Sequence, residues 1–308
     1  MNYEDNNEYI VPVVDAIILN ENNEVLLVKR HKNPFSGMWV LPGGKIDVED
    51  ESAPAAAKRE VKEETGLNIE ITHLFDVYSD PKRDVRFHSV STVYIGHVID
   101  GEIKSQPGET DDVRFFSLSQ LPKMGFGHKQ IIEQMQKQRK KGFVKAYDDR
   151  ELSVYAREWE KNGYTGNDDY LSIAVDTIVR NKKGDILWTF RAKRWCTNTW
   201  ILPGGHMKLG ETVVETMKRE SMEEAEVEVE FDRILTTAYG PFRNPKHPTL
   251  TVVCLATLKQ ELPFEENIEV SERHWVPVDN FPTPIGFDCE KLMKYYTEFL
   301  KEGLTQIV

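Results

Sequence analysis

The sequence has few of the features that mark membrane, secreted or disulfide-stabilised proteins. Its 308 residues include three cysteines, Cys196, Cys254 and Cys289, without a Cys-x-x-Cys pair, so neither a disulfide framework nor a zinc site is predicted. No apolar run approaches the roughly 20 residues needed to cross a bilayer. The start of the chain is acidic and polar, whereas a secretory signal needs a basic start and an apolar stretch. We therefore expect a cytoplasmic protein without a membrane partner.

Positive charge is also in deficit. The chain has 51 Asp and Glu against 39 Lys and Arg, which gives a net charge of −12 at pH 7. Nucleic-acid binding depends on Lys and Arg side chains that neutralise phosphates, so this balance disfavours a nucleic-acid partner. A small anionic substrate that binds through a metal cation remains open.

The chain contains an internal repeat, offset by about 160 residues. VVDAIILNENNEVLLVKR at 13–30 corresponds to AVDTIVRNKKGDILWTFR at 174–191, and both segments predict a β-hairpin around a polar turn. WVLPGGKIDVEDE at 39–51 corresponds to WILPGGHMKLGE at 200–211. Each copy closes with Gly-Phe and an amphipathic helix.

The repeat sets the expected domain organisation. Two copies are too few, and the period too long, for a solenoid. We therefore predict an α+β protein with two complete domains, at 1–142 and 170–308, joined by a linker at 143–169. The length of the chain agrees with two domains of average size.

Both copies carry an acidic segment with helical spacing, REVKEETGL at 59–67 and RESMEEAEV at 219–227. Glutamates three and four residues apart share one helical face, where like charges repel. A solvated surface tolerates such a face, but oxygen ligands also suit Mg²⁺ and Mn²⁺, and the recurrence of the pattern favours a cation site. Gly66 suits the left-handed end of the first helix. Glu226 takes that position in the second, at a cost on the order of 1 kcal/mol, so that helix is either strained or ends differently.

These segments fit the frame Gly-x5-Glu-x7-Arg-Glu-U-x-Glu-Glu-x-Gly-U, with U an apolar residue, and so resemble the Nudix box. The second copy matches from Gly205 through Glu211 and Arg219 to its glutamates, and departs at Ser221 and Glu226.

The first copy has one residue too many near the start of this frame. It matches from Glu51 onward, but six residues separate Gly44 from Glu51 instead of five. We place the extra residue in the loop that precedes Glu51.

The resemblance implies two tandem α/β/α sandwich domains with mixed sheets, and hydrolysis of a nucleoside diphosphate linked to another group with Mg²⁺ or Mn²⁺. Bound cations neutralise the diphosphate and lower the pKa of a coordinated water. It also implies that Arg59 and Arg219 orient the carboxylates. The implied metal ligands are Gly44, Glu60, Glu63 and Glu64 in the first copy and Gly205, Glu220, Glu223 and Glu224 in the second.

The catalytic candidates extend beyond the box. The main ligands Glu60, Glu64, Glu220 and Glu224 are joined by acids before a later strand, Asp112 (beside Asp111) and Glu272, because relatives often place a catalytic carboxylate in that loop. For these loop acids, a solvated surface position is an equally good interpretation.

The segment after the first acidic helix suggests a substrate. VYSDPKRDVRFHSVS at 77–91 resembles the corresponding stretch of Nudix ADP-ribose pyrophosphatases, although Val85 and Phe87 depart from it. Guanidinium groups suit a diphosphate, but surface positions for these arginines remain an alternative. Phe35, Trp39 and Tyr78 are candidates for adenine stacking, with core packing the more common role of such a Trp. The substrate-binding candidates are Arg30, Trp39, Arg83, Arg86, Arg191 and Arg243.

The second copy has AYGPFRNPKHPTLT at 238–251 instead, without the Arg-Asp run, so we expect a different specificity or reduced activity there. His247 in this segment is a candidate general base, against the commoner case of a loop histidine with no role.

The leading hypothesis is an enzyme whose N-terminal site hydrolyses ADP-ribose to AMP and ribose 5-phosphate. A nucleoside triphosphate or dinucleotide pyrophosphohydrolase is the nearest rival. An ADP-ribose sensor with a non-catalytic second domain is a third. Because relatives often form homodimers, we expect an internal pseudo-dimer that is monomeric in solution.

Overall fold

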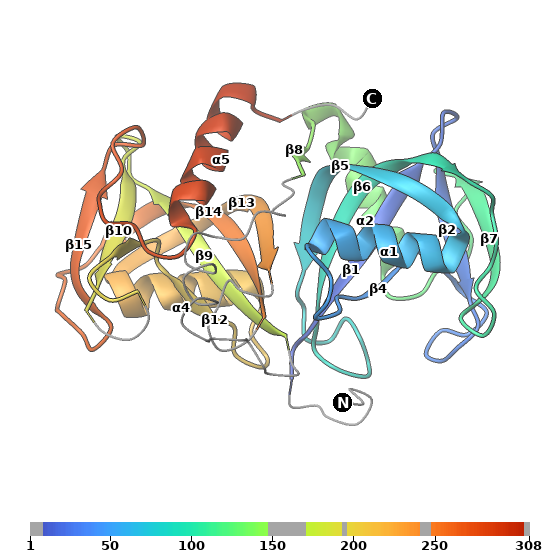
Figure 1. Cartoon of the computed structure of the whole chain (residues 1–308), viewed down its shortest axis with the longest axis horizontal. Coiled ribbons are helices and arrows are strands. Elements are labelled where there is room, and N and C mark those ends of the chain that lie inside the picture. Colours follow the sequence, from blue (N-terminus) through green and yellow to red (C-terminus); the bar gives the residue numbers. More distant parts are fainter. Residues whose placement is uncertain (1–8, 147–170, 193–195, 241–247, 305–308) are drawn as a thin grey trace. The chain divides into compact units, whose positions relative to one another are not determined.

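The computed structural model describes residues 9–146, 171–192, 196–240 and 248–304, which divide at the linker into two compact units (Figure 1). The two units have the same order of elements up to their last helix. None of the described helices combines the length and apolar character needed to cross a bilayer.

The first unit is built on a mixed eight-stranded sheet. Strands β1 (Val11–Leu19) and β6 (Ser89–Gly101) run parallel at its centre, and β6 pairs antiparallel with β5 (Leu67–Tyr78). The order is β3-β2-β1-β6-β5-β8, while β4 pairs with β1 and β7 with β2. The remaining elements are β2 (Glu24–Arg30), β3 (Trp39–Val40), β4 (Gly43–Lys45), α1 (Ala53–Thr65), β7 (Thr110–Ser117), α2 (His128–Gln138), a 3₁₀ turn η1 (Arg139–Lys141) and β8 (Val144–Lys145).

Two helices cover this sheet. Ile17 and Leu19 of β1 pack in one core cluster with Ile131 and Met135 of α2. Because side chains alternate along a strand, the residues between them face the other side of the sheet, where α1 contacts β1, β4 and β5. The predicted α/β/α sandwich is confirmed.

The second unit repeats this architecture with a seven-stranded sheet of order β11-β10-β9-β14-β13, in which β12 pairs with β9 and β15 with β10. Strands β9 and β14 are the parallel central pair. The elements are β9 (Ser172–Arg180), β10 (Ile186–Arg191), β11 (Trp200–Ile201), β12 (Gly204–His206), α4 (Val213–Ala225), β13 (Val227–Gly240), β14 (Thr249–Glu261), β15 (Val270–Val276) and α5 (Cys289–Glu302).

The predicted hairpins form around equivalent asparagines. The Asn20 side-chain oxygen accepts hydrogen bonds from the backbone N–H groups of Asn22 and Glu24, and Asn181 does the same with Lys183 and Asp185. Each asparagine thereby satisfies turn donors that water would otherwise have to meet.

The sheet of the first unit extends into the range that the sequence assigned to the linker. β8, at Val144–Lys145, pairs with His73 and Leu74 of β5, and Phe143 is fully buried in the core cluster with α2. The start of the 143–169 segment therefore belongs to the first unit.

Candidate active sites

The acidic helices begin at side-chain caps. The Ser52 hydroxyl accepts a hydrogen bond from the Ala55 N–H (3.1 Å), and Thr212 and Glu215 form the predicted capping box. Both helices are 13 residues long, so they present their glutamates at matching heights beside a short glycine-containing strand, β4 or β12.

The most buried glutamate of each helix binds the backbone of that strand. The Gly43 N–H donates to Glu64 Oε2, and the Gly204 N–H donates to Glu224 Oε2, both at 3.0 Å. Burial is the largest cause that raises the pKa of Glu64 and of Glu224 to about 8, with the neighbouring Glu60 or Glu220 carboxylate adding to it. Each unit therefore holds a buried carboxyl group that takes up a proton in the absence of a cation.

A second glutamate of each helix lies against the next glycine. A Cβ atom added at Gly44 would lie 2.4–2.5 Å from the carboxylate atoms of Glu60, and one at Gly205 would lie 2.5–2.7 Å from those of Glu220. Any other residue would displace the carboxylate. Burial raises the pKa of Glu60 to about 6 and raises that of Glu220 as well.

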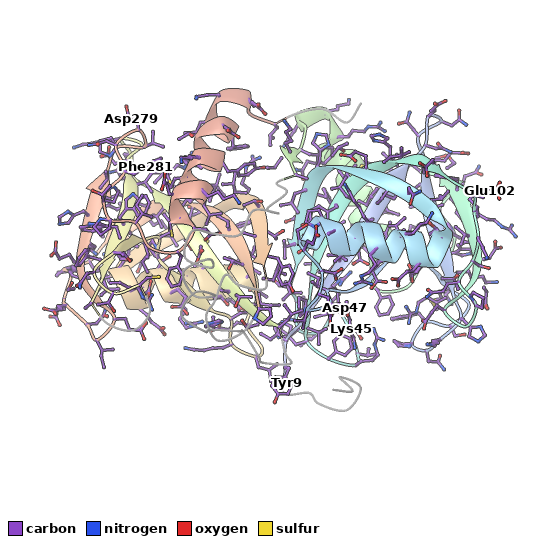
Figure 2. The ribbon with its side chains drawn as sticks, in the orientation of Figure 1. Tyr9, Lys45, Asp47, Glu102, Asp279 and Phe281 are labelled. Carbon is purple, nitrogen blue, oxygen red and sulfur yellow. The ribbon has the colours of Figure 1, made fainter. Side chains whose placement is uncertain are left out.

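An arginine binds each acidic cluster, in the place that the family resemblance implied. Arg59 Nη1 lies 2.8 Å from Glu60, while its Nη2 donates to the Lys45 carbonyl (3.1 Å) and lies 3.3 Å from Asp47. Figure 2 shows Lys45 and Asp47 close together at one end of the first unit. Arg219 has the same place in the second unit, with Nη1 2.5 Å from Glu220 and 3.1 Å from Glu223.

The clamp corrects the alignment of the first box. Arg59 binds both carboxylate oxygens of Asp50 (2.9 and 2.8 Å), just as Arg219 binds both oxygens of Glu211 (2.6 and 2.9 Å). Asp50 is buried, whereas Glu51 is exposed. The equivalent of Glu211 is therefore Asp50, which five residues separate from Gly44, and the extra residue lies between this acid and the helix. The shorter Asp side chain hid the match in the sequence.

The donor set suits a hard cation. Carboxylate oxygens converge beside a glycine where no Cβ intervenes, and Glu63 and Glu223 lie half-exposed on the same helical face. Within the described parts of the chain, however, no three acidic, His or Cys side chains already form a metal cage. Instead, one glutamate of each helix accepts a hydrogen bond from a backbone N–H, and another is bound by the clamping arginine.

The loop acids predicted to be catalytic lie elsewhere. Asp112 is paired across strands with Lys29, next to Arg30, and Glu272 with Phe190, next to Arg191. Side chains of cross-strand partners lie on the same face of the sheet, and side chains of neighbouring residues in a strand lie on opposite faces. Both acids therefore lie on the sheet face opposite Arg30 and Arg191. Asp112 instead binds Arg114 (2.6 Å), and Glu272 lies 3.4 Å from His274.

The acids that reach the sites come three residues earlier, at Glu109 and Glu269. Glu109 pairs with Lys32 and acts electrostatically on Arg30, together with Glu64. Glu269 acts on Glu224 and lines the same cavity. Sequence reasoning missed them because it chose the loop acids by resemblance to relatives, whereas the effects of Glu109 on Arg30 and of Glu269 on Glu224 arise from contacts between distant segments.

Arg30 and Arg86 approach each other above Phe126, with guanidinium carbons 5.1 and 5.5 Å from the centre of its ring. Burial, followed by the charge of Arg86, lowers the pKa of Arg30. Arg86 also binds both carboxylate oxygens of Asp84 (3.0 and 2.7 Å). Two neighbouring cations beside the acidic helix form a site suited to an anion.

Arg83 and Trp39, two further substrate-binding candidates, contact other side chains of the first unit. Arg83 Nη2 donates to the buried Asp15 carboxylate (3.0 Å), a residue that the sequence did not single out. The Trp39 ring packs edge-on against Phe116, with centroids 4.6 Å apart, on the core cluster under α2. The partly buried Trp39 ring therefore packs on the core, and its contact with a substrate stays a prediction.

The second unit contains a cavity of about 1070 Å³ that includes the acidic cluster. Arg191 lines it and lies 5.5 Å from the Phe287 ring, as Arg30 lies over Phe126. Arg243 and His247 lie outside the described residues. The residues that line the cavity beside the glutamates include Asp176, Arg191, Thr251, Ile268, Phe287 and Cys289.

Glu226 does not change how its helix ends. It adopts the left-handed conformation (φ 53°, ψ 43°), and its N–H reaches the Met222 carbonyl at 3.0 Å, as the Gly66 N–H reaches that of Lys62 at 2.9 Å. Of the two alternatives from the sequence, the strained helix end is the one found. Ser221 is fully buried, and its hydroxyl has no hydrogen-bond partner within the described parts of the chain.

Both units of the chain match one known protein family. The model of the NUDIX domain matches residues 10–135 and again residues 171–296. The chain belongs to the NUDIX family. Its two matches coincide with the two units that hold the Arg-clamped glutamates, and the chain is a NUDIX hydrolase.

Similar proteins with curated descriptions include an ADP-ribose pyrophosphatase of Methanocaldococcus jannaschii, 44% identical over 127 residues, which are 41% of this chain and 73% of that protein. A putative 8-oxo-dGTP diphosphatase of Bacillus subtilis is 38% identical over 107 residues, 35% of this chain and 66% of that protein. Among solved structures, the NUDIX domain of Shewanella oneidensis NrtR complexed with ADP ribose is 30% identical, covers 42% of this chain and 89% of that chain, and has a TM-score of 0.39.

Proposed function

We propose that both NUDIX domains hydrolyse diphosphate bonds with the help of Mg²⁺ or Mn²⁺, and that the N-terminal domain acts on ADP-ribose. The observation that carries this proposal is the duplicated constellation of a buried glutamate on a glycine N–H, a second glutamate on the next glycine, and a clamping arginine. The same contacts in both units support activity at both sites, in spite of Glu226.

Within this proposal Glu60, Glu63 and Glu64 hold the cation in the first domain, with the Gly44 carbonyl beside them. Glu220, Glu223, Glu224 and Gly205 correspond in the second. The cation would neutralise the diphosphate and acidify a bound water. Glu64 and Glu224 must be deprotonated to bind it, and their burial makes cation and proton compete for the same oxygens.

Other residues bind the diphosphate and accept the proton of the attacking water. Arg30 and Arg86 bind the diphosphate in the first domain, because an anion between two adjacent guanidinium groups offsets the repulsion between their positive charges. Glu109, or Glu269 in the second domain, supplies the additional carboxylate that accepts the proton of the attacking water.

The substrate assignment rests on chemistry and on similarity. The first domain carries the Arg83–His88 segment expected of ADP-ribose pyrophosphatases, and a relative so described is 44% identical over 127 residues. The second domain has a different segment and a large cavity, which supports a different nucleoside diphosphate compound or a nucleoside triphosphate as its substrate.

The test is a panel of ADP-ribose, dinucleotides and nucleoside triphosphates with Mg²⁺ or Mn²⁺, on the wild type, Glu64→Gln and Glu224→Gln. We expect Glu64→Gln to remove ADP-ribose turnover and Glu224→Gln to spare it. Loss of ADP-ribose turnover in Glu224→Gln alone would transfer that activity to the second domain. Tight binding of ADP-ribose without turnover by any metal would favour the alternative of a ligand sensor.

We also propose that the chain is monomeric in solution. The two domains duplicate within one chain what a homodimer would supply from two. A light-scattering mass of twice 35.6 kDa would contradict this.

A further inference from the structure

The acidic clusters around Arg59 and Arg219 differ in charge at one backbone position. The Asp47 N–H donates to Asp50 Oδ2 (2.8 Å) in the first domain, and the Lys208 N–H donates to Glu211 Oε2 (3.0 Å) in the second. The carbonyl oxygens of Asp47 and Lys208 accept hydrogen bonds from the N–H groups of the same two acids, at 3.1 and 3.0 Å. Asp47 and Lys208 are therefore equivalent residues of one turn, with side chains of opposite charge.

In the first domain this position adds a carboxylate to the cluster. Asp47 Oδ2 lies 3.3 Å from Arg59 Nη2, and its charge acts on Glu60. Four carboxylates then lie within 3.6 Å of the one guanidinium group, those of Asp47, Asp50, Glu60 and Glu63. The first cluster therefore keeps an excess of negative charge after its arginine is counted.

In the second domain the same position adds an ammonium group. Lys208 Nζ lies 3.7 Å from Glu223 Oε1, and its charge acts on Glu220. Arg219 Nη1 lies 3.1 Å from the other oxygen of Glu223, so two positive groups bind this one carboxylate. Lys208, Glu220 and Glu223 all line the large cavity of this domain. A cationic side chain therefore already lies at the carboxylates where they face the cavity.

The ion pair between Lys208 and Glu223 is not explained by the stability of the fold. Both side chains are more than half exposed, at 60% and 52%. Exposed ion pairs contribute little to stability, because water screens them and two long side chains lose freedom. The affinity of an oxygen site for a divalent cation, in contrast, depends on the charge of its ligands. The consequence of Lys208 therefore lies in how strongly the glutamates attract a cation.

Lys45, two residues before Asp47, does not take the place of Lys208. Its Nζ lies 5.6 Å from the centre of the Phe87 ring, which belongs to the segment at 77–91. In the sheet it corresponds to His206 of β12. The exchange that changes the charge acting on the glutamates is the one between Asp47 and Lys208.

We propose that Lys208 substitutes for one divalent cation in the second domain, so that this domain binds one cation fewer than the first, where the same position carries the carboxylate of Asp47. This inference rests on the proposed metal-dependent hydrolysis, because sites of that chemistry often hold two cations about 3.5–4 Å apart. The lysine ammonium carries positive charge and three N–H donors, so it offsets the charge of Glu223 without a metal ion.

The experiment counts the Mn²⁺ ions bound per full chain, by equilibrium dialysis at saturating free Mn²⁺ and one fixed pH, without substrate. Lys208→Asp gives the second domain the residue of the first, and Asp47→Lys does the reverse. Lys182→Asp is the matched control, since this exposed lysine lies in the hairpin turn between β9 and β10 and the charge changes by the same amount. Glu223→Gln is combined with Lys208→Asp to remove the carboxylate that the lysine binds.

We expect Lys208→Asp to raise the count by about one Mn²⁺ per chain and Asp47→Lys to lower it by about one, while Lys182→Asp leaves it unchanged. Glu223→Gln should remove the added ion. Circular dichroism identifies which exchanged variants are folded. An unchanged count in either folded variant, the same change in Lys182→Asp, or an added ion that survives Glu223→Gln would overturn the proposal.

Because the count does not depend on turnover, the two proposals can fail separately. The expected counts in a chain that hydrolyses no diphosphate compound would refute the proposed function and support the role of Lys208. Metal-dependent hydrolysis with counts that do not respond to the exchange would refute the role of Lys208 alone. A wild-type chain that binds no Mn²⁺ would refute both.

Discussion

The two NUDIX domains are nearly identical at their acidic helices and differ in the loop that precedes Trp39 and Trp200. Glu64 and Glu224 make the same 3.0 Å bond to a glycine N–H, and both have a pKa of about 8. Phe35 and Cys196, in contrast, hold the same backbone position with different side chains. The two domains therefore share the contacts of the acidic helix and differ in the side chain at this strained backbone position.

The largest expected effect tests whether the two sites are equivalent. Gly44→Ala and Gly205→Ala place a Cβ within 2.7 Å of the Glu60 and Glu220 carboxylates. We expect each to lower kcat/KM of its own domain about 10²–10⁴-fold, the range for loss of a positioned acid or base. Steady-state kinetics on each domain's substrate measures this. A loss in only one domain would show that the shared geometry does not mean shared function.

The next effect separates the two sets of loop acids. Glu109→Gln should lower kcat about 100-fold, because it loses the proton acceptor. Asp112→Asn, on the opposite sheet face, should change kcat less than twofold and serves as the control. The reverse result would restore Asp112 as the catalytic acid.

The corrected box makes a third prediction. Asp50→Asn removes the charge that Arg59 clamps, so Arg59 should compete for Glu60 and weaken cation binding about 10–100-fold. Glu51→Gln, at an exposed position, should leave it unchanged. Titration of activity with Mn²⁺ distinguishes them, and sensitivity at Glu51 would reinstate the original alignment.

The raised carboxyl pKa values predict a pH-dependent stability. Without metal, Glu64 and Glu224 bind protons more tightly in the folded than in the unfolded chain. Their contribution to stability is therefore fully present below their unfolded pKa of 4.5 and is lost as pH rises through about 8. Mg²⁺ should therefore raise the Tm more at pH 8 than at pH 6. A Tm gain that is independent of pH, or unchanged in the double variant Glu64→Gln/Glu224→Gln, would contradict this.

The smallest effect concerns the helix ends. Glu226→Gly relieves a left-handed non-glycine residue and should stabilise the second domain by about 1 kcal/mol. Gly66→Ala should destabilise the first by more, since its Cβ would also lie 2.4 Å from the Glu102 carbonyl oxygen. Urea unfolding followed domain by domain measures both. A destabilised Glu226→Gly would show that the glutamate side chain has a compensating contact.

The sequence by itself determined the duplication, the α+β class, the hairpins and the two acidic helices, whereas the role of the two arginines followed from the family resemblance. These features depend on local spacing: a helical period, a cap and a turn residue are readable along the chain. Only the tertiary structure decided that Asp50 and not Glu51 meets Arg59, and that Glu109 and Glu269 replace Asp112 and Glu272 near the sites. It also packed Trp39 against Phe116 and placed Arg83 on Asp15. Each of these outcomes depends on a strand register or on a contact between distant segments, and a one-residue shift in register moves a side chain to the opposite face of the sheet.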